Sequence, residues 1–379
     1  KLKLEALNEY KFLQEKLNSL KETNNFRVLK ECNSSLINFS SNDYLGLAND
    51  KDLLNEFYSN YHCKLSSSSS RLIDGSYPEV MELEKELEKI YNRAGIVFNS
   101  GFDANSSIIE TFYNKDTLII SDRLNHASIY DGIVNSGAKL LRYKHLDMEN
   151  LENLLIKYRD KYEDILIVTE TVYSMDGDVA DIKKLVELKR KYNFDLMVDE
   201  AHSYGVNGYG IAYENNLVQD IDFLVIPLGK GGGSVGSYLL CSQLCKDYII
   251  NKNRKFIFTT ALPPVNNCWN LFILKKMPEF LEKRERLQEL IRYFLSLLKE
   301  NSIDTSSTTH IVSIIIGDNR KIIKIAENLK NKGFLVYGVK EPTVPKGSAR
   351  FRIGLNPNFS KEDLERFVKE LKYEIDSVL

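Results

Sequence analysis

The sequence predicts an α/β protein whose large domain holds a mostly parallel seven-stranded sheet sandwiched by helices. Short apolar runs alternate with amphipathic helical patterns through the middle of the chain, and this alternation is typical of a parallel sheet. Most of the runs are apolar, as expected for strands buried on both faces. Polar residues directly follow several of these runs, at the edge of the sheet where such folds place their active sites.

The N-terminal part of the chain predicts a helix and a short strand. The helix is expected over residues 1–22, where apolar residues recur on one side at Leu4, Leu7, Tyr10, Leu13 and Leu17. The strand ends near Asn38. A helix over residues 78–91 begins with a proline, which suits the first turn of a helix.

The large domain contains seven predicted strands with helices between most of them. The strands are expected at residues 96–98, 118–121, 139–143, 165–169, 196–198, 223–226 and 235–240. The helices are expected at residues 101–112, 127–136, 148–159 and 181–192. Residues 263–300 predict long helices.

After residue 305 the pattern restarts and predicts a smaller α/β domain. Its strands are expected at residues 310–316, 334–337 and 350–355, and its helices at residues 321–332 and from Ser360 onward. We therefore expect an N-terminal segment (1–47), a large domain (48–275) and a small C-terminal domain (276–379), with the N-terminal segment packed on the small domain.

Composition narrows the class of protein. The 379 residues are 43% hydrophobic and 27% charged, which suits a globular enzyme with two or three structural units. A net charge of −2 favours neither nucleic acid nor an anionic membrane as a partner. No apolar stretch approaches the ~20 residues that span a bilayer. The five cysteines, at positions 32, 63, 241, 245 and 268, lack metal-ligand spacing, so we expect free thiols and a cytoplasmic protein.

Lys230 and Asp199 are the most informative residues. Lys230 follows an apolar strand and precedes three glycines, which allow a backbone to approach a ligand closely. Asp199 ends an earlier strand, where a buried carboxylate needs a partner. An enzyme that uses pyridoxal phosphate (PLP) requires both groups, because a lysine binds the aldehyde as a Schiff base and a carboxylate keeps the pyridine nitrogen protonated. Taken alone, each residue also fits a simpler role, as a solvated loop lysine or a structural carboxylate.

Other polar groups near strand ends fit the same chemistry. His202 can hydrogen-bond a phenolic oxygen, and His126 can lie flat on a conjugated ring or simply cap a helix. The segment Ser100–Phe102 opens a helix, where backbone N–H groups bind phosphate well. Arg350 and Arg352 point to the same side of one strand, so either can hold a substrate carboxylate.

Two rival interpretations of these motifs are weaker. Asp199-Glu200-Ala201-His202 resembles the second motif of some helicases, but a P-loop requires glycine six positions before its lysine and serine or threonine after it. Those two positions hold Leu224 and Gly231. A metal site on Asp199 and His202 has no third ligand nearby in the sequence, so we expect no metal.

Eight segments in the same order resemble the α-oxoamine synthases, which are PLP enzymes of fold type I, from about residue 36 to 375. They are Asn38–Leu47, Ser70–Gly75, Asn99–Asn105, Glu170–Asp178, Asp199–Ser203, Leu228–Lys230, Phe258–Pro264 and Ala349–Arg352. The resemblance implies a PLP cofactor and a homodimer with active sites at the subunit interface. Within the family the chain is most similar to members that condense L-alanine with pimeloyl-CoA in biotin biosynthesis. Sister members that use glycine or serine, and a non-catalytic partner subunit, are the alternatives.

The resemblance also implies a role for each matched residue. Lys230 would carry the cofactor, Asp199 would pair with its pyridine nitrogen, His202 would bond its phenolic oxygen and His126 would stack on its ring; these four are the expected catalytic residues. The other implied cofactor contacts are Ser100, Gly101, Phe102, Glu170 and Ser174, with Thr259 and Thr260 reaching the phosphate in the other subunit's site. The implied substrate contacts are Asn42, Ser70 and Arg350, and a serine at position 70 leaves room for the methyl group of alanine, although a serine substrate also fits. The tract Ser66–Ser69 departs from the glycine-rich run usual in the family.

Overall fold

The computed structural model describes residues 10–29, 31, 33–341 and 343–378. Contacts divide the chain into two compact units, each described by itself. The large unit comprises Asn42–Glu289 and Asn356–Asn358, and the terminal unit comprises the described parts of Lys1–Ser41, Leu290–Leu355 and Phe359–Leu379. The domain boundaries expected at residues 47 and 275 stay a prediction.

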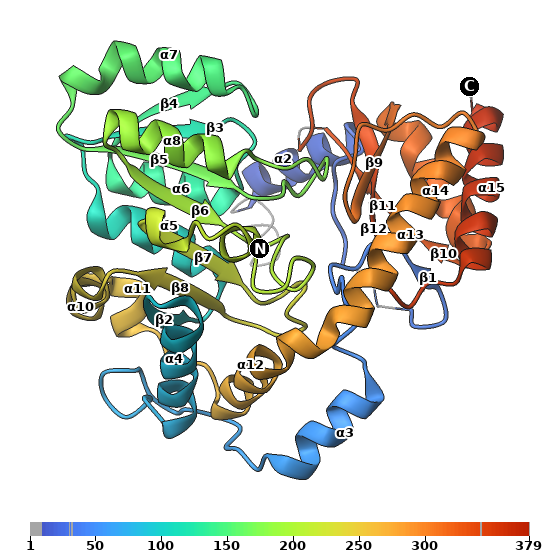
Figure 1. Cartoon of the computed structure of the whole chain (residues 1–379). Coiled ribbons are helices and arrows are strands. Elements are labelled where there is room, and N and C mark those ends of the chain that lie inside the picture. Colours follow the sequence, from blue (N-terminus) through green and yellow to red (C-terminus); the bar gives the residue numbers. More distant parts are fainter. Residues whose placement is uncertain (1–9, 30, 32, 342, 379) are drawn as a thin grey trace, which may run out of the picture. The chain divides into compact units, whose positions relative to one another are not determined.

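The large unit is built on a seven-stranded sheet in the order β2-β8-β7-β6-β5-β3-β4 (Figure 1). The strands are β2 (Ala94–Phe98), β3 (Leu118–Asp122), β4 (Lys139–Tyr143), β5 (Ile165–Glu170), β6 (Asp195–Asp199), β7 (Phe223–Pro227) and β8 (Ser237–Cys241). β8 runs antiparallel to both of its neighbours, and the other pairs are parallel. The predicted fold class, a mostly parallel sheet in an α/β protein, is confirmed.

Helices alternate with the strands, and side chains cap the first turns of four of them. The helices between the strands are α4 (Pro78–Tyr91), α5 (Gly101–Phe112), α6 (Ala127–Ser136), α7 (Met148–Tyr158) and α8 (Ile182–Tyr192). Ser100, His126, Asp147 and Asp181 each accept a hydrogen bond from a backbone N–H of the helix that follows. The core between α5, α6 and the sheet includes Ile108, Ile129, Leu166, Val168 and Met197, all fully buried. Capping therefore fixes where these four helices begin.

Several elements were not predicted or differ from the prediction. The helices whose bounds were not predicted are α3 (Lys51–Asn60), α9 (Ile211–Glu214), α10 (Gln243–Lys252) and α11 (Arg254–Phe258). The long helical stretch divides into α12 (Pro264–Lys276), the 3₁₀ turn Met277–Phe280 and α13 (Leu281–Glu300). Two further 3₁₀ turns are Arg159–Lys161 and Val218–Asp220. None of the helices in the described ranges is both long and apolar enough to cross a membrane.

The terminal unit joins segments from both ends of the chain. Its antiparallel sheet has the order β11 (Tyr337–Val339), β12 (Ala349–Gly354) and β9 (Ile311–Gly317). Its helices are α2 (Lys11–Glu22), α14 (Asn319–Asn331) and α15 (Lys361–Val378). The predicted strand at 334–337 is in fact two pieces, because β10 (Phe334–Leu335) pairs with β1 (Ile37–Asn38) whereas β11 pairs with β12.

Phe39 anchors the N-terminal segment in the terminal unit. Its ring stacks on Phe359 at 4.6 Å and on Phe367 at 4.1 Å. This packing confirms that the N-terminal segment lies against the small domain. Residues 1–9 of the first predicted helix, including Leu4 and Leu7, lie outside the described residues.

The expectation of free thiols is wrong for two cysteines. Cys63 and Cys268 form a disulfide across 205 positions of sequence. The backbone brings them together, because Val265 N–H donates to Lys64 O over 3.0 Å. Cys241 and Cys245 are free, and Cys32 lies outside the described residues.

Candidate active site

A cavity of about 180 Å³ lies in the large unit, where β5, β6 and β7 end and where α5 and α6 begin. We call it the strand-end cavity. The predicted residues that line it are Ser100, Gly101, Phe102, His126, Glu170, Asp199, His202 and Lys230. Asn105, Ser128, Ala201, Pro227, Gly229, Val235 and Gly236 complete the lining. Residues from well-separated parts of the sequence therefore meet at one edge of the sheet, as the strand-end pattern predicted.

Asp199 is held rigidly at the end of β6. It is 4% exposed, and Asn105 Nδ2 donates to its Oδ2 over 2.6 Å. The backbone N–H of Ala201 donates to its Oδ1 over 2.7 Å. Asn105 was not predicted from the sequence. Its Oδ1 is buried and has no hydrogen-bond partner among the described residues. A carboxylate oriented on both oxygens can present a fixed negative charge to a ligand.

His202 is positioned by two residues from the start of the large unit. Its Nδ1 lies 2.7 Å from the hydroxyl of Tyr44, and that hydroxyl lies 3.0 Å from Asn42 Oδ1. Tyr44 is fully buried and was also not predicted. Asn42 does not line the cavity, but this chain of polar groups connects it to His202.

His126 caps α6 and presents a neutral ring to the cavity. Ser128 N–H donates to His126 Nδ1 over 3.2 Å, so this nitrogen acts as an acceptor. Burial, together with the nearby Lys230 ammonium, lowers the pKa of His126 below 6.5 against the opposing effect of Asp199. An uncharged imidazole suits stacking on a conjugated ring.

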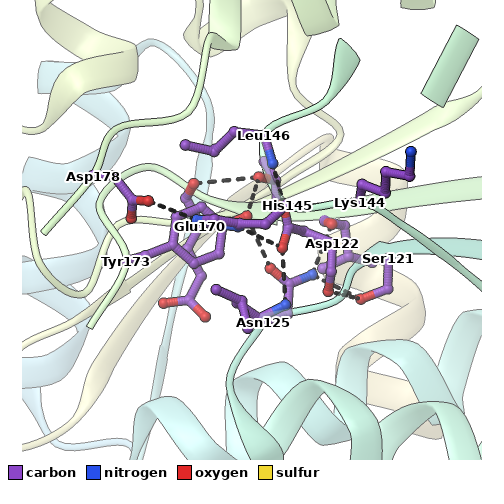
Figure 2. A network of polar contacts seen from close by, with 12 residues as sticks. Ser121, Asp122, Asn125, Lys144, His145, Leu146, Glu170, Tyr173 and Asp178 are labelled. Atoms are coloured by element: carbon purple, nitrogen blue, oxygen red, sulfur yellow. Dashed lines mark hydrogen bonds and ion pairs between the residues drawn. The ribbon is translucent and has the colours of Figure 1, made fainter. Parts of the chain in front are cut away.

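Glu170 ends β5 and fastens the turn that carries His126. Its Oε1 accepts a hydrogen bond from His126 N–H over 2.6 Å. Burial, reinforced by the Asp199 charge, raises the pKa of Glu170 well above its ordinary value. Figure 2 shows Glu170 beside a polar network that includes Asp122, His145 and Asp178.

Lys230 lies in a tight glycine-rich loop after β7. A Cβ at Gly231 would lie 2.2 Å from Tyr204 O, so the loop can approach its neighbour only with glycine there. Gly233 N–H closes the turn on Lys230 O over 2.9 Å, and Trp269 Nε1 donates to Gly233 O over 3.0 Å. This backbone holds the half-buried Lys230 in the lining of the cavity.

The N-terminus of α5 forms a compact wall of the cavity. Ser100 Oγ accepts from Asp103 N–H over 3.0 Å. A Cβ at Gly101 would lie 2.6 Å from Pro227 Cγ, so only glycine allows the helix start to pack against the end of β7. Free N–H groups and the positive end of the helix dipole favour an anion such as phosphate at this place.

Besides Asn42, five predicted site residues do not line the strand-end cavity. Ser174 belongs to the loop after β5 and does not line the cavity. Ser70 and Thr260 form an isolated antiparallel bridge, next to Thr259. Arg350 lies in β12 of the terminal unit, is 8% exposed, and donates from Nε to Ser348 O over 3.1 Å. The roles expected for these residues therefore stay predictions.

The strand-end cavity fits PLP by the chemistry of its side chains. It combines a lysine, a buried fixed carboxylate, an uncharged histidine and a helix N-terminus. Those groups match an aldehyde, a pyridinium nitrogen, a flat ring and a phosphate.

Comparison with known proteins identifies the family. The sequence matches the aminotransferase class I and II family over residues 34–371. A relative from Glaesserella parasuis serovar 5, provisionally named 8-amino-7-oxononanoate synthase, is 42% identical over 338 residues, which cover 87% of this chain and 89% of the relative. The solved 8-amino-7-oxononanoate synthase of Francisella tularensis has a TM-score of 0.76 at 30% identity, covering 91% of this chain and 99% of that one.

A second solved relative carries the cofactor. A serine palmitoyltransferase variant from S. paucimobilis, with PLP and myriocin bound, has a TM-score of 0.87 at 26% identity and covers 98% of both chains. Together with the fold and the cavity, these matches show that the chain belongs to the aminotransferase class I and II family and is a PLP-dependent acyltransferase of the α-oxoamine synthase type.

Proposed function

We propose that the enzyme condenses L-alanine with pimeloyl-CoA to give 8-amino-7-oxononanoate, CoA and CO₂, a step of biotin biosynthesis. The observation that carries this proposal is the 42% identity to a relative provisionally named for that product. The solved 8-amino-7-oxononanoate synthase of F. tularensis supports the same reaction, at a lower sequence identity of 30%. Ser70 is consistent with alanine, because a small residue at that position leaves room for a methyl group, although a serine substrate also fits.

The cavity residues divide the work of holding the cofactor. Lys230 would bind the aldehyde covalently, and Asp199 would hold the proton on the pyridine nitrogen, since its position is fixed by Asn105 and Ala201. His202, oriented by Tyr44, would bond the phenolic oxygen. His126 would cover one face of the ring, and the start of α5 would bind the phosphate.

The chain's own groups then move the protons of the reaction. When bound, PLP supplies an aldehyde that captures an amine and a ring that accepts electrons. Lys230, released as a neutral amine, would remove the Cα proton of alanine as a general base. A C–C bond forms between that Cα and the thioester carbonyl, and the C–S bond breaks to release CoA. Loss of CO₂ and return of a proton to the same carbon complete the balance. Arg350 and Asn42 would bind the substrate carboxylate.

A sister reaction with serine and a long acyl-CoA is the second candidate. It is favoured by the serine palmitoyltransferase variant, whose TM-score of 0.87 exceeds the 0.76 of the synthase. Sequence identity to the curated relatives favours the alanine reaction instead. A catalytically inactive partner subunit is disfavoured because Lys230 and Asp199 both line the cavity.

The test is product detection with purified protein and a matrix of substrates. Alanine, glycine and serine would each be combined with acetyl-, pimeloyl- and palmitoyl-CoA, and products identified by mass. We expect 8-amino-7-oxononanoate from alanine and pimeloyl-CoA at the highest kcat/KM. A preference for serine with palmitoyl-CoA would overturn the proposal in favour of the second candidate.

We also propose that the enzyme works as a homodimer in the cytoplasm. Thr259 and Thr260 do not line the strand-end cavity of their own chain, which is consistent with a contact to the phosphate in the other subunit's site. The cytoplasmic proposal rests on the relatives and on composition, because the Cys63–Cys268 bond removes the argument from free thiols.

A further inference from the structure

The ring of His145 lies between two carboxylates just outside the strand-end cavity. His145 follows β4, and its Nδ1 lies 2.8 Å from Asp122 Oδ1 while its Nε2 lies 2.7 Å from Asp178 Oδ2 (Figure 2). A neutral imidazole carries one N–H and can donate to only one of these acceptors. A doubly protonated ring can donate to both, so the geometry favours an imidazolium between the two side chains.

Asp122 connects this ring to the turn that carries His126. Asp122 is the last residue of β3 and is fully buried. Its Oδ1 accepts from Leu124 N–H over 2.8 Å, and its Oδ2 accepts from Leu146 N–H over 3.0 Å. These hydrogen bonds tie the segment after β4 to the segment that leads into His126.

Asp178 connects the same ring to the loop that carries Ser174. This loop, residues 171–180, follows β5 and is closed by a bridge between Val172 and Val179. Tyr173 N–H donates to Asp178 O over 3.0 Å. Within the loop, the side chain of Asp178 points to His145 in Figure 2.

Tyr173 extends the contact back toward β3 and β5. Its ring stands edge-on to His145, with centroids 4.5 Å apart. Its hydroxyl lies 2.9 Å from Thr169 Oγ1 and 3.3 Å from Asn125 Oδ1. Asn125 directly precedes His126. The ring of His145 and the ring of Tyr173 thus pack at the junction of three strand-end segments.

We propose that His145, as an imidazolium, is a positioning residue that holds the His126 turn and the Ser174 loop in one arrangement. The inference rests on the proposed function, in which His126 would cover one face of the cofactor ring, and on the cofactor contact that the resemblance implies for Ser174. Asp122 from β3 and Asp178 from the loop after β5 supply the charges that face the ring, and Tyr173 supplies its edge contact. With the ring deprotonated, one of the two segments loses its attachment.

The pKa of His145 supports the geometric argument. Burial alone would lower it, but hydrogen bonds to Asp122 and Asp178 raise the pKa to about 9. The attachment is therefore complete at neutral pH and is released in alkaline solution. A purely structural histidine would not couple the loop to pH in this way.

The test compares His145→Gln, Asp178→Asn and the control His62→Gln, whose histidine is exposed in the same unit. Hydrogen exchange of the holoenzyme without substrate would report protection factors for residues 123–129 and 171–180 between pH 7 and pH 10. Wild type and the control should lose protection of the loop with a midpoint near pH 9. His145→Gln should lower that protection roughly tenfold at pH 7 and abolish the midpoint. Asp178→Asn removes one charge and should shift the midpoint down by about one pH unit.

Steady-state kinetics separate positioning from general damage. His145→Gln should raise the KM for the amino acid more than it lowers kcat, with the bound-cofactor spectrum kept. Wild-type protection of both segments in His145→Gln, or an unshifted midpoint in Asp178→Asn, would overturn the proposal. Asp178→Asn retains a carbonyl acceptor, so it keeps the test decisive if the histidine variant does not fold. Hydrogen exchange is measured without substrate, so its outcome does not depend on which amino acid the enzyme uses. A failure of the alanine reaction would be seen only in the product assay.

Discussion

Asn105 donates a hydrogen bond to Asp199 across 2.6 Å, joining the second turn of α5 to the end of β6. The same amide nitrogen lies 3.1 Å from Ser128 Oγ at the start of α6. One side chain therefore connects three elements that surround the cavity. Its consequence is that the Asp199 carboxylate has little rotational freedom before any ligand arrives.

Asp199→Asn should separate chemistry from binding. The amide has the same shape but cannot balance a protonated ring nitrogen, so we expect kcat to fall by about 10²–10³. Steady-state assays would measure kcat, and a cofactor titration would measure the Kd for PLP. Asp195→Asn, at the other end of β6, is the matched control and should leave kcat near wild type. A variant at position 199 with full activity would contradict the assigned role.

Lys230→Ala should abolish turnover and the covalent attachment of PLP. The alanine has no amine to bind the aldehyde or to remove a proton. Borohydride reduction followed by peptide mapping would locate the adduct in wild type, and the adduct should be missing in the variant. Lys115→Ala, in an exposed loop, should retain both the adduct and activity. An adduct at any other lysine in wild type would refute the assignment.

Gly101→Ala should weaken cofactor binding through a clash. The added methyl group would lie 2.6 Å from Pro227 Cγ and would displace the start of α5 from the end of β7. We expect the Kd for PLP to rise at least tenfold in fluorescence or absorbance titrations. Gly132→Ala also creates a clash, 2.7 Å from Ser106 O, but in the contact between α5 and α6. That control should lower the melting temperature and leave the Kd unchanged.

The stability of the fold should depend on pH through His145. Its pKa is about 9 in the folded chain and 6.5 when unperturbed, so the folded state binds this proton more tightly. The resulting stabilisation is complete below pH 6.5 and is lost as the pH rises through about 9. His145→Gln should lower the free energy of unfolding by about 1.5–3 kcal/mol at pH 6 and by much less at pH 10. Urea unfolding at both pH values would show this; an equal deficit at the two values would speak against it.

The disulfide should contribute measurably to stability. Replacing Cys63 and Cys268 together with serine should lower the free energy of unfolding by about 2–4 kcal/mol in the absence of reductant. Dithiothreitol should destabilise wild type to a similar degree and leave the double variant unaffected. Cys245→Ser serves as the control because Cys245 is a free thiol. If denatured, unreduced wild type titrates with every thiol reactive, then the bond is absent from the protein.

The strand-end residues could be predicted because each follows its strand directly. The sheet itself brings Glu170, Asp199 and Lys230 to one edge, so local patterns were enough. Asn105 was missed because it lies inside a helix, although a polar residue three positions before the buried Ile108 was an available signal. Tyr44 gave no local signal at all, since only the folded chain brings it to His202.

Other features depended on contacts that spacing does not encode. Cys63 and Cys268 are 205 positions apart, and nothing in the sequence pairs them. The extent of α10 was not predicted because the helix buries only Ile249 and so lacks an apolar stripe. The break between β10 and β11 arises because the two pieces pair with different strands, β1 and β12.

The pairing of β1 with β10 has a consequence for synthesis on the ribosome. Ser40 and Leu335 are 295 positions apart, so the strand near the start of the chain waits for its neighbour until translation is almost finished. The aromatic partners of Phe39 emerge later still. The main stretch of the large unit ends at Glu289. This stretch can therefore fold from residues that have already left the ribosome. Nascent chains stalled before residue 334 should therefore expose Phe39 to chaperones while the large unit is already compact.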